Sequence, residues 1–155
     1  TKNASLGLGL TVLRAAKMAK EGRPMEEIAQ DAAYRSAHME HIFTVDSLDH
    51  LKRGGRISAA QAFVGGLLQI KPLLHFEDGA ILPLEKVRGQ KHIVKRMVEI
   101  MAQRGCNLSE QLVGISHGDN EALALDLADA VKAEFGVKDI LMSWIGPVAL
   151  FFQNA

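Results

Sequence analysis

The chain has 155 residues, of which 48% are hydrophobic and 23% are charged, so it can bury the core of one ordinary domain and is not typical of a disordered chain. Its 18 basic and 18 acidic residues give a formal net charge of zero, which does not indicate a nucleic-acid-binding protein. The single cysteine excludes an internal disulfide bond and favours the cytoplasm. No apolar run approaches the ~20 residues of a membrane-spanning helix, so we expect no stable membrane insertion.

The predicted elements change from mostly helical over about 5–70 to alternating helix and strand in the remainder of the chain. In chain order they are helices over 5–22 and 24–38, a strand over 41–46, helices over 47–54 and 59–68, strands over 72–76 and 81–87, a helix over 90–104, a strand over 111–116, a helix over 120–135 and a strand over 139–145, with 148–152 as a candidate further strand. This order predicts an α/β fold in which helices pack on a layered sheet.

Capping and turn residues set several of these boundaries. Ser5 is expected to cap the first helix with its hydroxyl, Gly22 to end that helix, and Pro24 to take the first position of the next one. Glu77-Asp78-Gly79 lies between two strand patterns and predicts a hairpin turn. The helix predicted over 90–104 is amphipathic and turns four apolar side chains inward: Ile93, Met97, Ile100 and Met101.

The segment Leu51–Ser58 contains the residue types that an anion site requires. Gly54-Gly55 allows a backbone turn, and Ser58 caps a following helix whose first N–H groups are free to hold an anion. Arg56 adds a planar, permanently charged donor group suited to a carboxylate or phosphate. The same spacing also fits the end of one helix followed by the start of another, and spacing alone favours this structural interpretation.

Two glycine-containing helical patterns indicate close packing or an apolar ligand. Ser5-Leu6-Gly7-Leu8-Gly9 is not a phosphate-binding loop, because it lacks Gly-Lys-Ser/Thr and no strand pattern precedes it. These glycines, like Gly65-Gly66 in the apolar helix over 59–68, leave room for a neighbouring element or for an acyl chain. The sequence leaves both interpretations open.

The six histidines do not form a metal-binding pattern. His38 and His41 come closest to one another, but no cysteine or acidic motif completes them, so we expect surface or interface histidines and no metal site. Ser116-His117-Gly118-Asp119 follows a strand and precedes a helix, where α/β proteins often bind ligands. A turn with a helix cap at Asp119 also explains this segment and is the preferred interpretation, and no Ser-His-Asp triad is supported.

Four segments, in this order, resemble the DegV family of fatty-acid-binding proteins. Residues 5–9 followed by Leu13-x-Ala15-Ala16-Lys17 are similar to the SxGxG…LxAAK segment of that family, and 43–58 (FTVDSLDHLKRGGRIS) is similar to its central motif. Residues 66–72 and 78–89 continue the match over nearly all of 1–155. Several motifs in register are more specific than one glycine pair, so the resemblance favours a functional role for Arg56.

The resemblance implies a DegV-like C-terminal lipid-binding domain, part of a two-domain protein that encloses one long-chain fatty acid in an apolar tunnel. Such proteins are the non-catalytic binding subunits of bacterial fatty acid kinases, and they present the acyl carboxylate to a separate catalytic subunit that uses ATP. No cofactor is implied. Arg56 is expected to contact the head-group region or the kinase, and the other residues are expected to line the tunnel or its mouth: Ser5, Ile57, Ser58, Phe63, Leu67 and Ile70.

The sequence departs from the family pattern at both ends. The N-terminal domain of the family, with its Ser/Thr-rich head-group loop, is absent from these 155 residues. Trp144-Ile145-Gly146-Pro147-Val148 runs directly into Ala149-Leu150-Phe151-Phe152, where the family has a His- and Gly-rich loop that contacts the head group. Either this loop is deleted or its residues are not among these 155, and in both cases we do not expect this chain alone to bind the carboxylate directly.

Two other functions remain open from the residues alone. One is an α/β enzyme that acts on a small anionic substrate, which would require polar groups converging near Arg56 and His117. The other is a module that only forms dimers, which its size in solution would reveal.

Overall fold

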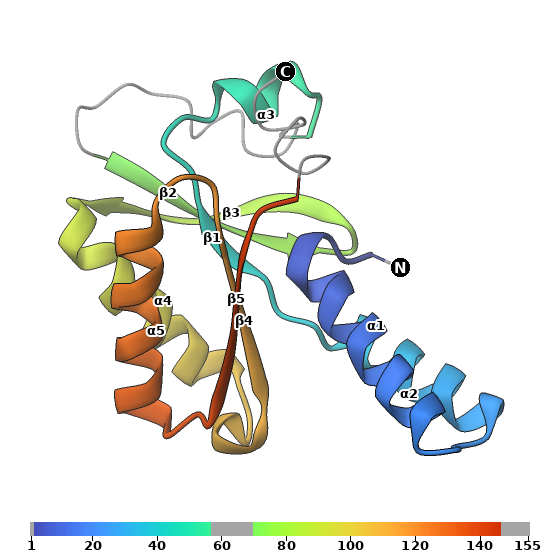
Figure 1. Cartoon of the computed structure of the whole chain (residues 1–155). Helices are drawn as coiled ribbons and strands as arrows, with labels where there is room; N and C mark the ends of the chain where they lie inside the picture. Colours follow the sequence, from blue (N-terminus) through green and yellow to red (C-terminus); the bar gives the residue numbers. More distant parts are fainter. Residues whose placement is uncertain (1, 57–69, 147–155) are drawn as a thin grey trace.

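The computed structural model describes residues 2–56 and 70–146 of the chain (Figure 1). The helix expected over 59–68 and the candidate strand over 148–152 lie outside these described residues. None of the helices that are described combines the length and the hydropathy needed to cross a membrane.

Helices and strands alternate as expected, and the α/β prediction is confirmed. The elements are α1 (Ser5–Lys20), α2 (Met25–Ala37), β1 (Ile42–Thr44), α3 (Asp49–Arg53), β2 (Ile70–Glu77), β3 (Ala80–Arg88), α4 (Gln90–Arg104), the 3-10 turn η2 (Leu108–Glu110), β4 (Leu112–His117), α5 (Glu121–Phe135) and β5 (Asp139–Trp144). Within the described residues the strands form two sheets, an antiparallel sheet in the order β1-β2-β3 and a parallel pair, β4-β5.

The β2–β3 hairpin forms at the turn that the sequence predicts. Glu77 pairs with Ala80, and the two residues between them have positive φ angles, 52° at Asp78 and 82° at Gly79. Two successive left-handed residues make the tight turn whose twist matches that of paired strands, and Asp-Gly is a preferred sequence for it. Farther along, Leu73 pairs with Glu85 but Leu74 pairs with Pro83, so β3 bulges where proline cannot donate a hydrogen bond.

The three-stranded sheet buries apolar side chains on both of its faces. Neighbouring Leu73 and Leu74 are both fully buried, and because side chains alternate along a strand they enter different clusters. Leu73 packs with Ile93, Met97 and Ile100 of α4, which begins and ends at the residues predicted from its periodicity. Leu74 packs with Leu48 and Leu51 beside α3.

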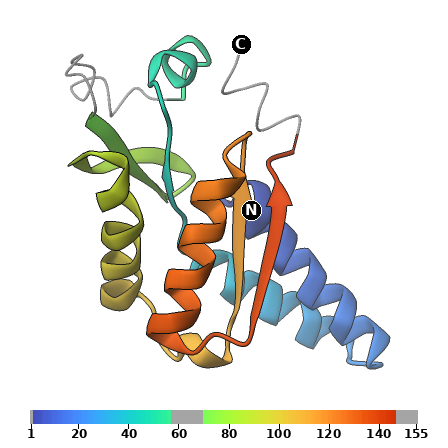
Figure 2. The ribbon, with the colours of Figure 1, turned by 60° about the vertical axis from the view of Figure 1, so that its left-hand side comes forward.

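Among the described elements, the α1–α2 hairpin projects from the sheets, and the beginning of α1 lies closest to them (Figure 1). No residue of α2 is buried. A Cβ added at Gly114 of β4 would lie 3.1 Å from Leu10 Cδ1 and 3.3 Å from Leu6 Cδ1, so the glycine allows α1 to pack closely on the strand. Figure 2 shows α1 on one side of the β4–β5 pair and α5 on the other.

Three helix starts differ from the sequence predictions by one residue. Ser5 does not cap α1: Ala4 occupies the N-cap position with an extended backbone, whereas Ser5 is the first helical residue and has a φ of 48°. Asn120 caps α5, because its side-chain oxygen accepts the Leu123 N–H at 3.3 Å, whereas Asp119 has a left-handed φ of 64°. Pro24 is likewise the N-cap of α2 and not its first helical residue.

Candidate functional site

An open cleft of about 2000 Å³ is bounded by α1, the three-stranded sheet and the β4–β5 pair. Each of these elements contributes apolar side chains to its walls. They include Leu10 and Leu13 of α1, Phe43 of β1, Phe76 of β2, Ile81 of β3 and Val113 of β4. A concave surface of mainly apolar side chains with a few polar groups is typical of a small-molecule site.

An aromatic wall on the sheet faces this cleft. The Phe43 and Phe76 rings lie with their centroids 5.5 Å apart, and the His41 ring lies 5.1 Å from Phe76. The alternation of side chains explains this arrangement, because Ile42 points to the α4 side of the sheet while Phe43 joins the opposite cluster. The wall therefore combines large apolar area with one titratable ring.

His41 occupies the space beside Gly7 of α1. A Cβ added at Gly7 would overlap the imidazole, with the ring atoms Cε1 and Cδ2 only 2.7 and 2.9 Å away. Burial lowers the pKa of His41, although the backbone of Met39 and Ala4 and the Glu40 carboxylate act in the opposite direction. Neither ring nitrogen makes a well-formed hydrogen bond within the described part of the chain.

Cationic side chains also line the cleft, and several of them are paired. Arg35 Nε donates to Asp31 Oδ2 at 2.6 Å, and Arg14 Nε lies 3.9 Å from the same oxygen. Arg104 Nη1 donates to Glu40 Oε2 at 3.2 Å. Because these cations are paired and the acidic residues Glu40, Asp46, Glu110 and Asp119 also line the cleft, the charge of the lining does not by itself select an anionic ligand.

Arg56 lies at the end of a helix cap. The Arg56 N–H donates to the Leu51 carbonyl at 3.0 Å and the Gly55 N–H donates to the Lys52 carbonyl at 3.1 Å, with Gly55 at a φ of 68°. These two bonds and the left-handed glycine form a Schellman motif, so the glycine pair ends α3 as the structural interpretation expected. The exposed Arg56 side chain lines the cleft, and its Nη1 donates to the Gly54 carbonyl at 2.7 Å.

The structure brings two of the seven predicted site residues, Ser5 and Arg56, to this cleft. Ile70 is half-buried at the start of β2, opposite Arg88, and does not line the cleft. Its role as a tunnel residue stays a prediction. The other four lie outside the described residues: Ile57, Ser58, Phe63 and Leu67.

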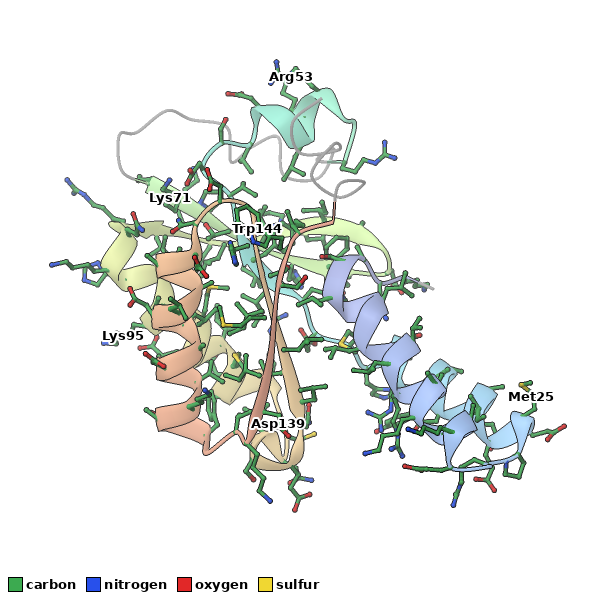
Figure 3. The ribbon with its side chains drawn as sticks, viewed as in Figure 1. Met25, Arg53, Lys71, Lys95, Asp139 and Trp144 are labelled. Atoms are coloured by element: carbon green, nitrogen blue, oxygen red, sulfur yellow. The ribbon has the colours of Figure 1, made fainter. Side chains whose placement is uncertain are left out.

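His117 and Trp144 end the two parallel strands side by side. They are cross-strand partners in the β4–β5 register, and their ring centroids lie 4.9 Å apart. Trp144 is 63% exposed, and both residues line the cleft. Figure 3 shows Trp144 at the end of β5, far from Met25 at the tip of the α1–α2 hairpin.

Sequence reasoning did not single out the residues that form the aromatic wall. The sequence predicts His41 only as a surface or interface histidine, and Trp144 belongs only to the segment that departs from the family pattern near residue 145. The glycines of the first helix indicated close packing or an apolar ligand. The neighbour that the structure places at Gly7 is the His41 side chain, which the sequence did not predict. Across the described residues, no group of three or more His, Cys, Asp or Glu side chains is arranged to hold a metal ion.

Known proteins resemble this chain in sequence and in structure. A DegV domain-containing protein of Clostridium perfringens is 42% identical over 149 residues, which are 96% of this chain and 51% of that protein. The chain spans about half the length of the curated relatives it matches.

Solved structures share the fold. A DegV family protein of Thermus thermophilus, described by its fatty acid binding, has a TM-score of 0.83 at 29% identity and is matched over 98% of this chain and 55% of its own. The Fatty Acid Kinase (Fak) B3 protein of Streptococcus pneumoniae, solved with linoleic acid, has a TM-score of 0.80, and the match covers 93% of this chain and 51% of that protein's chain. Because the two sequences are only 23% identical, this likeness shows the fold alone.

The sequence pattern, the fold and these relatives agree. A family model described as an uncharacterised protein of the DegV family matches residues 1–153, and the chain therefore belongs to the DegV family.

Proposed function

We propose that this chain contributes one wall of a site for a long-chain fatty acid, with the acyl chain lying in the cleft. The observation that carries the proposal is that α1, β1, β2 and β4 all contribute apolar side chains to one cleft. Each acyl CH₂ that leaves water is worth about 0.8 kcal/mol, so a long chain gives ample affinity through contact with side chains such as Phe43 and Phe76.

The size of the cleft supports a shared site. Its volume of about 2000 Å³ exceeds the roughly 300–1,000 Å³ of most small-molecule pockets, and it is open. Relatives of about twice this length have further residues that could close such a cleft. In the protein at its natural length, we propose that a second wall completes the tunnel and encloses the acyl chain.

The carboxylate of the fatty acid requires polar partners at the rim. Ser5 offers a hydroxyl and Arg56 a guanidinium, and both line the cleft. The Arg56 guanidinium already contacts the Gly54 carbonyl, so it would have to turn away from that oxygen to bind a carboxylate directly. We therefore propose that Arg56 acts at the mouth of the site, on the head group or on the partner protein.

The partner in this proposal is a separate kinase subunit, and the chain itself performs no bond chemistry. The kinase would transfer the γ-phosphoryl group of ATP to a carboxylate oxygen, giving an acyl phosphate and ADP. The DegV resemblance supports this step, and the likeness to the Fak B3 protein adds only a common fold. The use of ATP supports the cytoplasm as the compartment of this proposed reaction. The presence of a single cysteine, which cannot form an internal disulfide bond, supports the same compartment.

The geometry supports an enzyme with a small anionic substrate less well. That function requires Arg56 and His117 to converge on one point. The Arg56 guanidinium instead contacts the Gly54 carbonyl, and the His117 ring packs against Trp144. Neither of these contacts joins Arg56 to His117.

The first experiment is native mass spectrometry of the protein at its natural length, purified from cells, followed by denaturing extraction. A stoichiometric long-chain fatty acid is expected, and its mass gives the preferred chain length. A protein that emerges without lipid and does not take up added oleate would contradict the proposal. A protein that binds oleate but is not a substrate for the cognate kinase with ATP would contradict only the kinase step.

A matched pair of variants tests the position of the acyl chain. Leu13 and Leu125 are each 49% exposed on a helix, but only Leu13 lines the cleft. Leu13→Gln should weaken oleate binding roughly five-fold, because about 1 kcal/mol of apolar contact is lost from a half-exposed leucine. Leu125→Gln should leave it unchanged. Equal effects of the two substitutions would mean that the acyl chain does not lie along α1.

A further inference from the structure

We propose that His41 is a positioning residue whose neutral imidazole holds the first turn of α1 against the β1–β2 wall. In acid the imidazole becomes charged, so that α1 is released and ligand binding weakens. The contact between the His41 ring and Gly7 is called the seat. The ligand part of this inference rests on the proposed function, whereas the seat itself can be tested without any ligand.

The contact is closed from several sides. On α1, the absence of a Cβ at Gly7 lets the imidazole approach the helix backbone. On β2, the centroid of the Phe76 ring lies 5.1 Å from that of the His41 ring. The Ala4 backbone also lies near the ring. The imidazole is therefore held between the first turn of the helix and the sheet.

Few charged groups face this ring. The first two turns of α1, 5–11, contain no titratable side chain. On β2, Glu77 is exposed, and the Nδ1 of buried His75 lies 3.2 Å from Arg104 Nη1 of α4. The adjacent Glu40 is the acid that favours a charged His41, and it already accepts a bond from Arg104. At the nearby hairpin, Asp78 pairs with Lys2 at 2.6 Å.

These surroundings disfavour a charged imidazole in the seated arrangement. Burial is the main cause of the lowered pKa of His41, and release into water would restore an ordinary value. A lowered pKa means that the seated state binds fewer protons than the released state. The seat is therefore fully stable above the ordinary histidine pKa of about 6.5 and weakens as the pH falls below it.

The position of the seat connects it to the ligand. Ser5, Leu6 and Gly7 line the cleft together with His41, so movement of this turn changes the rim and one wall at once. Ser5 is also the residue of this turn that we propose to lie at the mouth.

The test measures hydrogen exchange of the α1 amides at 8–11, corrected for intrinsic rates, between pH 7.5 and 5 in the protein at its natural length. Between pH 7.5 and 5, the equilibrium constant for opening the contact between His41 and Gly7 should increase by up to about thirty-fold. This is the limit for a ring that stays neutral in the closed contact and ionises with a pKa of about 6.5 when released. His41→Leu, which fills a similar volume without titrating, should remove this pH dependence. His41→Gln serves as a second neutral variant if the leucine variant does not fold.

His38→Gln is the control, because His38 is exposed on the same chain segment and stacks on Tyr34 outside the seat. It should keep the pH profile of the unmodified protein. Exchange that does not change with pH, or that changes equally in the His41 variants, would overturn the proposal.

Oleate binding measured over the same pH range separates the two parts. Loss of affinity in step with exchange supports the full inference. Exchange that responds to acid while the oleate affinity stays constant would overturn the link to the ligand. If the protein binds no oleate at any pH, the proposed function fails and the exchange result still decides the role of His41.

Discussion

Replacing Gly7 with alanine should destabilise the protein, whereas the same replacement at Gly9 should not. Both glycines lie in α1, but an added Cβ at Gly7 would overlap the His41 ring, whereas at Gly9 its nearest neighbour is Leu6 Cδ2 at 3.9 Å. The half-buried His41 ring lies between Gly7 and the Phe76 ring, so moving it aside would disturb its contact with the wall.

The magnitude follows from two opposing terms. Alanine in place of glycine favours a helix by up to about 1 kcal/mol, and this gain applies to both variants, although less fully to Gly7 in the first turn. Overpacking a closed site costs about 1–3 kcal/mol, and this cost applies to Gly7→Ala alone. The free energy of unfolding of Gly7→Ala should therefore be lower than that of Gly9→Ala by about 1–3 kcal/mol.

The assay is urea unfolding of the two variants and the unmodified protein, read by circular dichroism at neutral pH. In thermal unfolding, the same free-energy difference would separate the melting temperatures of the two variants by about 2–12 °C for a chain of about this length. The double variant Gly7→Ala/His41→Ala provides the decisive comparison, because removing the ring should remove most of the Gly7→Ala penalty. Equal stabilities of Gly7→Ala and Gly9→Ala, or no coupling to His41, would refute the reasoning.

Three further predictions concern other parts of the structure. Glu85 accepts two hydrogen bonds from Arg96, at 2.6 and 2.8 Å, and these bonds lower the pKa of Glu85. Glu85→Gln should therefore reduce the free energy of unfolding by up to about 1 kcal/mol at pH 7. Acid and salt titrations of unfolding should show this difference fade as the pH falls through the lowered pKa, and also in high salt. Gly55→Ala should destabilise α3 by about 1–2 kcal/mol because of its φ of 68°, and Gly55→Asn should do so less because asparagine tolerates that conformation; equal thermal unfolding of the two variants would contradict this reasoning. Trp144 is the only tryptophan and lines the cleft, so oleate binding should shift its fluorescence emission to shorter wavelength, and a constant spectrum in a protein that mass spectrometry shows to be loaded would place the ligand elsewhere.

Elements with local causes could be predicted from the sequence. The bounds of α4 and the hairpin turn at Asp78-Gly79 match the predictions, because a 3.6-residue apolar period and a two-residue turn depend on neighbours in the chain. The helix starts differ from the predictions by one residue at Ser5, Pro24 and Asp119. Capping depends on the backbone conformation of one residue, and the composition of the segment does not determine which residue takes it.

The candidate site was only partly predictable. Ser5 and Arg56 were chosen through a family resemblance, and both line the cleft. The role of Gly54-Gly55 as a helix end followed from the preference of left-handed positions for glycine. The contacts of the Arg56 side chain could not be predicted in the same way, because they depend on the rotamer of a long exposed side chain.

The sequence by itself therefore determined the α/β class, most helices and strands, and the family to which the chain belongs. Only the tertiary structure decided that the described strands divide into two sheets, that a cleft lies between them and α1, and that His41 fills the space left by Gly7. The physical reason is distance along the chain. Periodicity and turn preference act between neighbouring residues. The pairing of Gly7 with His41 depends instead on how separate elements pack, and close packing is decided by all of the contacting side chains together.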